Sequence, residues 1–331
     1  MAEFKIDPND FSRFAGLTIL TTTYKTVSGH PITTDVLIPK HLTEASTAAP
    51  SPSPVLLRYH GGGFIAASSL FPMFFQPWYI ELAQRHSAVI VSPNYRLAPE
   101  ASIEELLEDI EDHWKWLHKE LPSYVQQQTN GRVSIDTSRI LTAGDSAGGY
   151  LSLMMGLLHP NEIRACAAAY PEIDLKATHH TEGSKGPILG LPKVPFSVAE
   201  AHLSKVRDGS LPAIISADPG FERASLMFAF VHDGLSKHLF PAEKRHLFPF
   251  EKLDDGARFP RGGVFVWHGN EDTLVPVEGS IRLKEKVTEL DPELEFHLAL
   301  RPGEHGFDHT TKLDEDWMAD GFKNLVKAWL E

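Results

Sequence analysis

The chain has 331 residues, of which 42% are hydrophobic, and a formal net charge of −13 at pH 7. A chain of this length can bury a large core, and α/β folds of this size are often single units, so we expect one domain over residues 1–331. The acidic balance, without a Lys/Arg-rich run, argues against nucleic acid or an anionic membrane surface as a partner.

The N-terminus and the cysteine content bear on the compartment. Residues 1–10 lack the basic-then-apolar layout of a signal peptide, and no apolar run is long enough to span a membrane, so we expect a cytoplasmic protein. Cys166 is the only cysteine, which excludes an intrachain disulfide, and its alanine-rich surroundings are typical of a small buried side chain. The sequence leaves the oligomeric state open, including a homodimer.

Two β-branched runs stand near the start of the chain. Leu17 to Val27 and Ile32 to Ile38 flank the pair Ser28-Gly29, which predicts an antiparallel hairpin at the beginning of a sheet. Residues 41–54 are rich in Ala, Ser, Thr and Pro, which predicts a surface loop.

A glycine-rich loop follows the next apolar run. Residues 54–59 predict a buried strand, and the sequence His-Gly-Gly-Gly-Phe follows at 60–64. The pattern Gly-x-Gly-x-x-Ala at 61–66 formally fits the dinucleotide-binding fingerprint, but that fingerprint needs an acid after the next strand, where Pro-Asn stands at 93–94. The alternative is the loop of esterases whose backbone N–H groups bind the oxygen of a tetrahedral intermediate. The candidate oxyanion donors in this loop are Gly61, Gly62 and Gly63.

A Gly-x-Ser-x-Gly turn lies between a predicted strand and a predicted helix. The apolar run at 140–143 reads as a buried strand, the pattern spans Gly144 to Gly148, and Tyr150 to Leu158 looks helical. Strand, sharp turn and helix together predict a nucleophile elbow, with Ser146 as the nucleophile and the N–H of Ala147 as a further oxyanion donor. An ordinary serine in a glycine-rich turn is the alternative interpretation.

Three segments together resemble the hormone-sensitive-lipase-type family of α/β-hydrolase esterases. They are His-Gly-Gly-Gly-Phe at 60–64, Tyr-Arg-Leu-Ala-Pro-Glu at 95–100 and Gly-Asp-Ser-Ala-Gly-Gly at 144–149. The resemblance implies an α/β fold with an eight-stranded, mostly parallel sheet flanked by helices and a helical cap. It also implies hydrolysis of carboxylic esters without a metal or another cofactor.

The middle of the chain contains regular elements and then a break. Ala101 to Leu121 predicts an amphipathic helix, and Ile163 to Tyr170 predicts a central strand. Residues 176–260 do not continue this alternation of strands and helices. They contain scattered Gly and Pro, short segments with a helical pattern and several phenylalanines. We therefore predict a cap formed by about residues 1–15 and 176–260. The residues predicted to form an apolar substrate wall after the oxyanion loop are Phe64, Phe74 and Phe75.

The last third of the chain supplies a candidate acid and a candidate base. Glu271 and Asp272 follow an apolar strand, and the family pattern His-Gly-x-x-Asp matches residues 268–272, which favours Asp272 over Glu271. In this resemblance His268 has a supporting role at most. Asp272 would fix the tautomer and orientation of the catalytic histidine.

His305 is the histidine that we expect to act as the base. It follows the last predicted strand, Leu294 to Leu300, and completes the order Ser, Asp, His that α/β-hydrolases use. The spacing of His305 and His309 would suit two metal ligands on a helix, but Gly306 argues against a helix there, so we predict no metal. Residues 314–330 predict a closing amphipathic helix.

These patterns predict a serine carboxylesterase that hydrolyses short-to-medium acyl or small-molecule esters through a Ser-His-Asp triad and an acyl-enzyme. The expected partner is a small-molecule ester. Two alternatives stay open, namely an acyltransferase with the same triad and a non-catalytic small-molecule receptor on the same scaffold.

Overall fold

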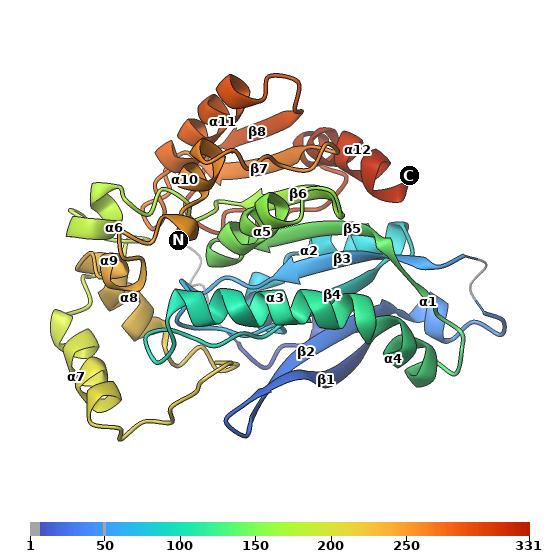
Figure 1. Ribbon diagram of the computed structural model, residues 1–331, viewed down its shortest axis with the longest axis horizontal. Coiled ribbons are helices and arrows are strands. Elements are labelled where there is room, and N and C mark those ends of the chain that lie inside the picture. The colour runs from blue at the N-terminus through green and yellow to red at the C-terminus, as the bar shows by residue number, and fades with distance from the viewer. Residues whose placement is uncertain (1–6, 49–50) are drawn as a thin grey trace.

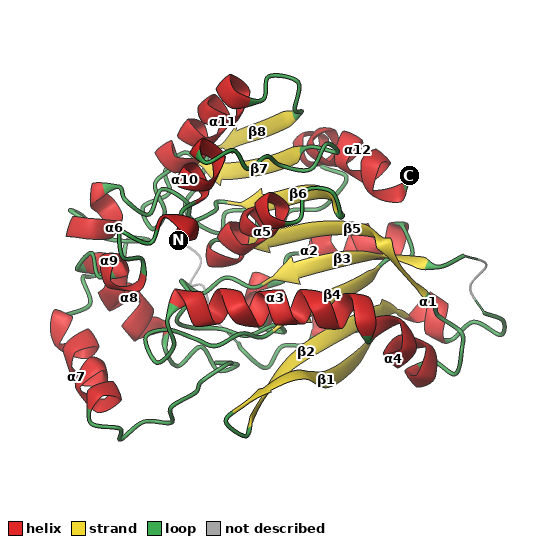
Figure 2. Ribbon diagram, in the orientation of Figure 1, coloured by secondary structure: helices red, strands yellow, loops and turns green. Residues whose placement is uncertain are grey.

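The computed structural model describes residues 7–48 and 51–331, which form one mixed sheet with helices on both faces (Figures 1 and 2). Its order is β1-β2-β4-β3-β5-β6-β7-β8. The eight-stranded, mostly parallel sheet with flanking helices that the sequence predicts is thereby confirmed. In this part of the chain the strands are β1 (Leu17–Val27), β2 (His30–Pro39), β3 (Ser53–Tyr59), β4 (Val89–Pro93), β5 (Ile135–Asp145), β6 (Ile163–Ala169), β7 (Val264–Gly269) and β8 (Phe296–Arg301).

The antiparallel part of the sheet is the predicted hairpin. β1 pairs with β2, and β2 pairs with β4, both antiparallel, whereas every pair from β4 to β8 is parallel. Ser28 and Gly29 join β1 to β2 with φ of 48° and 83°. Two consecutive positive φ values give the tight turn whose twist matches the flanking strands.

The helices confirm the predicted positions with small shifts of their ends. The predicted helix at 101–121 ends at Lys119, and a separate helix begins at Leu121, next to Pro122. The predicted loop at 41–54 contains one helical turn at its start. Within the described residues the helices are α1 (Lys40–Thr43), α2 (Pro77–Arg85), α3 (Ile103–Lys119), α4 (Leu121–Gln128), α5 (Ala147–Leu158), α6 (Thr178–Glu182), α7 (Phe196–Arg207), α8 (Ala224–His232), α9 (Ser236–Leu239), α10 (Pro249–Asp254), α11 (Glu278–Leu290) and α12 (Asp316–Leu330), with single 3-10 turns η1 (Ser12–Phe14), η2 (Pro72–Phe74) and η3 (Arg245–Leu247).

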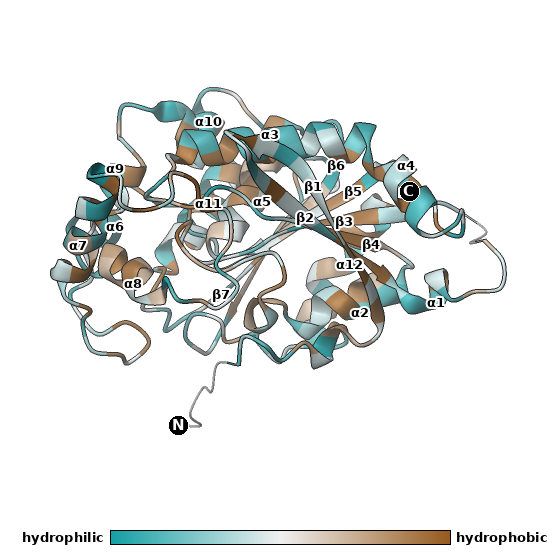
Figure 3. Ribbon diagram, turned by 90° about the horizontal axis from the view of Figure 1, so that it is seen from below, coloured by the Kyte–Doolittle hydropathy of each residue, from teal (hydrophilic) through white to brown (hydrophobic). Residues whose placement is uncertain are grey.

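Alternate residues of the central strands face two different cores. In β7, Val264 and Val266 belong to the core that also contains side chains of α3, α5 and α11, whereas Phe265 and Trp267 belong to the core that contains side chains of α2 and α12. Because successive side chains of a strand point to opposite faces, strands buried on both sides are apolar throughout. Figure 3 shows this as brown central strands beside helices that are partly brown and partly teal.

The segment that the sequence assigns to a cap lies mainly beyond the carboxyl ends of the strands. There, α6 to α9 lie away from the sheet (Figure 1), and α8 forms a separate apolar cluster with Ile65 and Ala98. Leu253 of α10 instead joins the main core. Residues 1–6 of the predicted cap lie outside the described residues. In the ranges 7–48 and 51–331, no helix is long and apolar enough to cross a bilayer.

A buried ion network attaches α3 to the sheet. Arg96, in the loop after β4, donates to both carboxylate oxygens of Asp109 at 2.8 Å. Lys25 of β1 lies 2.8 Å from the same carboxylate, which is fully buried. Glu108 also contacts Arg96, at 3.0 Å, but its side chain is 62% exposed.

We predict that Asp109→Ala lowers the free energy of unfolding by about 3–5 kcal/mol, because two cations would lose their buried counter-charge. Glu108→Gln, the matched control on the same guanidinium, should lower it by at most about 1 kcal/mol, because water screens an exposed pair. Urea unfolding of both variants measures the difference. Equal losses would contradict this account of the network.

Candidate active site

Ser146 stands at a sharp turn between β5 and α5. Its backbone has φ 57° and ψ −120°, a conformation that non-glycine residues rarely adopt. Its N–H donates to the carbonyl oxygen of Ala169 at 2.9 Å, and its own carbonyl oxygen accepts from the N–H of Glu172 at 3.2 Å. The turn is therefore held by hydrogen bonds to the end of β6 and to the loop that follows it.

The two glycines of the turn are required by close backbone approaches. A Cβ at position 144 would overlap the carbonyl oxygen of Gly148, and a Cβ at position 148 would overlap the carbonyl oxygen of Tyr59 in β3. The Gly-x-Ser-x-Gly pattern thus lets the first turn of α5 press against two strands.

The glycine-rich loop after β3 lies beside this turn. Gly62 and Gly63 have φ of 111° and 60°, which suits glycine, and a Cβ at position 62 would overlap the carbonyl oxygen of Ala66. The ring of His60 stacks on Tyr95 with 4.2 Å between centroids, and its Nδ1 lies 2.8 Å from the carbonyl oxygen of Gly61. Burial lowers the pKa of His60 to about 3, so the ring is neutral, and its contacts with Tyr95 and Gly61 hold the loop.

Asp272 and His305 meet at the same edge of the sheet. Nδ1 of His305 lies 2.7 Å from Oδ2 of Asp272. Nε2 of His268 lies 3.1 Å from that oxygen and 2.9 Å from the carbonyl oxygen of Val275, so Nε2 must carry the proton. The other oxygen of Asp272 accepts from the N–H of Val275 at 2.8 Å. Among the described residues, His305 makes no hydrogen bond to Ser146; such contacts often tighten only when substrate binds.

The neighbouring acid, Glu271, points elsewhere. Its carboxylate accepts a hydrogen bond from the N–H of Gly303. The loops that carry Asp272 and His305 are joined by Glu304, which accepts from the N–H of Thr273 at 2.8 Å. The geometry therefore brings Asp272, and not Glu271, to the histidine.

Negative charge surrounds His305. Burial acts to lower the pKa of His305, but the charge and hydrogen bond of Asp272, with further charge from Asp145 and Glu172, raise it above the usual value. Burial acts to raise the pKa of Asp272, and the charge of His305 with hydrogen bonds from His268 and His305 outweighs it, so this pKa lies far below its usual range. The two groups therefore favour an imidazolium beside a carboxylate.

Three more buried polar residues lie around His305, namely Tyr170, Glu172 and Asp308. The sequence patterns assign no chemistry to them. The ring of Tyr170 lies 4.3 Å from that of His305, and its hydroxyl donates to Asp308 at 2.9 Å. Burial raises the pKa of Glu172 to about 7. The positions of Tyr170 and Glu172 could have indicated a place in the site. Both directly follow β6, the strand next to β5, and so lie at the carboxyl ends of the strands, where Ser146 also lies.

A small pocket opens at Ser146. Its lining residues come from the oxyanion loop, α8 and the loops after β5, β6 and β7, and they are Gly63, Ser146, Glu172, Met227, Val231, Leu274 and Val275. The phenylalanines predicted as a substrate wall pack elsewhere. Phe64 is buried against Tyr150, Phe74 packs on Phe221, and Phe75 is fully buried. Their part in substrate binding stays a prediction.

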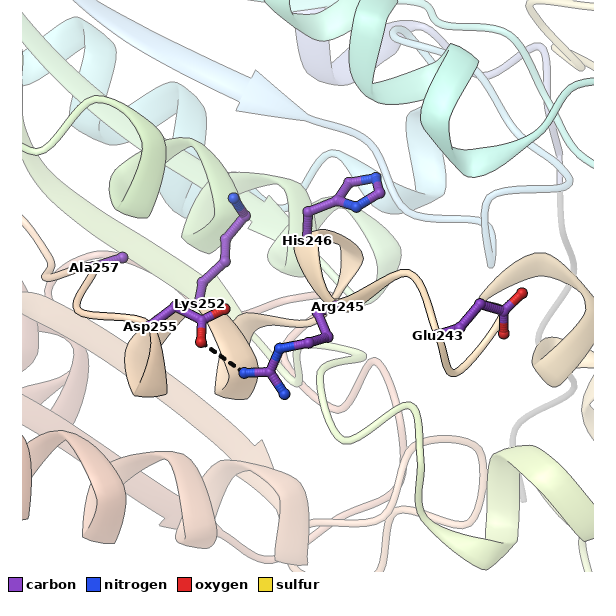
Figure 4. A pocket seen from close by; sticks show the side chains of 6 residues that line it. All are labelled: Glu243, Arg245, His246, Lys252, Asp255 and Ala257. Carbon is purple, nitrogen blue, oxygen red and sulfur yellow. Dashed lines mark hydrogen bonds and ion pairs between the residues drawn. The ribbon is translucent and has the colours of Figure 1, made fainter.

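A second pocket lies at the surface around η3 and α10 (Figure 4). Arg245 and Asp255 point toward each other there, 2.6 Å apart, and both are more than half exposed. Its lining consists of Glu243, Arg245, His246, Lys252, Asp255 and Ala257. None of the predicted site residues lies there, and we assign this pocket no chemistry. In residues 7–48 and 51–331, no cluster of three or more His, Cys, Asp or Glu side chains could hold a metal ion.

Solved structures of esterases share this fold. An esterase of the fungus Rhizomucor miehei superposes with a TM-score of 0.61 at 20% identity, covering 98% of this chain and 86% of that one. A bacterial heroin esterase superposes with a TM-score of 0.59 at 19% identity, covering 97% and 86% of the two chains. At such identities the likeness concerns the fold alone.

Sequence comparison gives the family. A family model described as alpha/beta hydrolase fold matches residues 56–214. The protein named probable carboxylesterase M8, from a Phoma species, is 30% identical over 323 residues, which are 96% of this chain and 98% of that protein. The similarity thus extends over nearly the whole chain and includes all three segments noted in the sequence. The chain belongs to the hormone-sensitive-lipase-type family of α/β-hydrolase esterases.

Proposed function

We propose that this protein is a serine carboxylesterase for small-molecule esters, with Ser146 as nucleophile, His305 as general base and Asp272 as the residue that orients His305. The observation that carries the proposal is the 2.7 Å contact between Nδ1 of His305 and Oδ2 of Asp272. This contact lies at the carboxyl ends of the strands, where Ser146 stands on its strained turn. The similarity to a carboxylesterase over nearly the whole chain supports the same reaction.

The reaction proceeds in two halves. Oγ of Ser146 bonds to the ester carbonyl carbon while its proton passes to Nε2 of His305. The imidazolium, stabilised by Asp272, gives that proton to the departing alkoxy oxygen, which leaves an alcohol and an acyl-serine. Water then attacks the acyl-serine by the same proton transfers and releases the acid.

The oxyanion is bound by the backbone N–H groups of Gly62, Gly63 and Ala147. Ala147 is the first residue of α5, so its N–H has no partner within the helix. The backbone of Gly61 instead interacts with the carboxylate of Asp145, which favours the other two glycines as donors. Of the four candidates in the sequence, Gly61 is therefore assigned to holding the loop.

Residues 176–260, together with residues 7–15, the described part of the predicted N-terminal cap segment, form a cap over this site. Support comes from α8, whose Met227 and Val231 line the pocket at Ser146. Met227 also lies where a Cβ at Gly63 would stand. The cap therefore contributes to the shape of the acyl or alcohol site.

Acyl transfer to an alcohol would use the same three residues. Hydrolysis is the better supported reaction because the relative that matches nearly the whole chain is named a carboxylesterase. Product analysis in the presence of a competing alcohol separates the two reactions: acid alone indicates hydrolysis, and a new ester indicates transfer. A receptor role would require binding without turnover.

Ser146→Ala should lower kcat/KM for p-nitrophenyl butyrate by at least about 1,000-fold, because it removes the nucleophile and leaves only the binding groups. The circular dichroism spectrum should stay unchanged, because alanine lacks only one oxygen. Ser204→Ala, on the exposed surface of α7, is the matched control and should keep full activity. Turnover within tenfold of the wild type in a folded Ser146→Ala protein would refute the assignment.

The pH profile tests the base. His305 must be neutral to accept the proton, and Asp272, Asp145, Glu172 and Asp308 are the acids that interact with it. Because its pKa is raised, kcat/KM should be full above that pKa and fall as the pH drops through it, with a midpoint above about 6.5.

A series of kcat/KM measurements from pH 5 to 9 locates this midpoint. Asp272→Asn removes the strongest charge that raises the pKa, so its residual activity should titrate at a lower pH. A flat profile, or one midpoint shared by both proteins, would exclude His305 as the base.

A further inference from the structure

One carboxyl group in the pocket at Ser146 takes no part in the proposed proton transfers. Glu172 follows β6 and is 5% exposed, yet it lines the pocket together with Ser146. Its backbone N–H donates to the carbonyl oxygen of Ser146 at 3.2 Å. The backbone of residue 172 is therefore tied to the turn that carries Ser146, and both residues line the same pocket.

This carboxyl group has no hydrogen-bond partner among the described residues. Nδ1 of His180 lies 3.5 Å from Oε1 of Glu172, and that nitrogen is itself buried without a hydrogen-bond partner. The side chain of Glu172 is 7% exposed, so little water reaches its carboxyl group, and a mostly buried acid without a hydrogen bond to the protein is costly. A group on the substrate could supply the missing partner.

Burial favours the neutral form of Glu172. Burial raises its pKa to about 7, and the charge of His305 acts to lower it. Burial lowers the pKa of His180 to about 3, so this neighbour is a neutral ring and offers no counter-charge. A partner for Glu172 must therefore suit a neutral acid as well as a carboxylate.

We propose that Glu172 binds a hydroxyl group of the substrate, so that the enzyme prefers esters with a hydroxyl near the scissile carbonyl over their methyl isosteres. This inference rests on the proposed ester hydrolysis. A hydroxyl both donates and accepts, so it can pair with either form of the acid.

The rest of the pocket favours a neutral hydroxyl over an ammonium group. Met227 and Val231 from α8 and Leu274 and Val275 after β7 form aliphatic walls. An ammonium group would lose its water there with a single, partly protonated acid as compensation, which is unfavourable. Among the described residues, no aromatic ring lines the pocket to bind a cation through its face.

The test uses two ester pairs that differ by OH against CH₃. Methyl 3-hydroxybutyrate with methyl 3-methylbutyrate places the change on the acyl side, and 2-hydroxyethyl butyrate with propyl butyrate places it on the alcohol side. Acid release in a pH-stat at pH 8 gives kcat/KM for each ester. We expect the hydroxyl-to-methyl ratio of at least one pair to fall about tenfold or more from wild type to Glu172→Leu.

Comparing ratios between proteins cancels the different intrinsic reactivity of the two esters. Glu172→Gln keeps the shape of the side chain and should give an intermediate ratio, so it also serves if the leucine variant does not fold. Ser204→Ala, on the exposed surface of α7, leaves the pocket and the carboxyl group intact and should leave the ratio unchanged. Ratios equal in the wild type and the Glu172 variants would overturn the proposal, as would a larger Glu172-dependent preference for methyl 3-aminobutyrate.

A binding measurement separates this inference from the proposed function. In a Ser146→Ala background, calorimetry should show that the hydroxyl ester of the responsive pair binds more tightly than its methyl isostere, and that Glu172→Leu removes the difference. If the wild type hydrolyses no ester while this difference persists, the proposed function fails and the hydroxyl site stands. If the wild type hydrolyses all the esters and binding does not depend on Glu172, the hydroxyl site fails alone.

Discussion

The left-handed backbone at Ser146 is the constraint on which the rest of the site depends. A non-glycine residue held at φ 57° and ψ −120° costs about 1–3 kcal/mol, so the surrounding structure must impose it. It does so with a hydrogen bond from Ser146 to the end of β6 and with Gly148 packed on the backbone of Tyr59. The strain is thus compensated by the two strands that flank β5, which places the serine at the edge of the sheet.

The sheet order explains why residues far apart in sequence meet at this point. β5, β6, β7 and β8 are neighbours and all run parallel, so the loops that carry Ser146, Glu172, Asp272 and His305 leave from the same edge. Burial at the carboxyl ends of the strands favours the neutral form of each titratable group. The contact between His305 and Asp272 outweighs burial, so it raises the pKa of His305 and lowers the pKa of Asp272. Asp145 has the guanidinium of Arg58 at 3.3 Å and Glu172 has only the ring of His180 at 3.5 Å, and burial outweighs these contacts and raises the pKa of each acid to about 7.

The sequence predicts those parts of the fold and site that depend on local constraints. Gly62 and Gly144 are required by close backbone approaches within a few residues, to Ala66 and Gly148, so a local sequence pattern could mark them. The β-branched and continuous apolar runs located the strands. Asp272 and Glu271 could be separated only through a resemblance, because either acid could occupy the loop after β7 until the path of that loop is known. The acid at 308 could not be recognised, because its proximity to His305 depends on the path of its loop, whereas Glu172 could be placed near Ser146 only by its position directly after the strand next to β5.

Met227 of α8 packs against Gly63 in the glycine-rich loop after β3. This contact joins the segment predicted as a cap to the sheet domain. Cγ of Met227 lies 2.8 Å from the position that a Cβ at residue 63 would take, so the glycine makes room for α8 as well as for its own positive φ. Met227 belongs at the same time to the apolar cluster of α8 and to the lining of the pocket at Ser146. Displacement of α8 would therefore alter the space beside Gly63. Variation in this segment can change the shape of the pocket at Ser146 in this way without altering Asp272 or His305, which stand in the loops that follow β7 and β8.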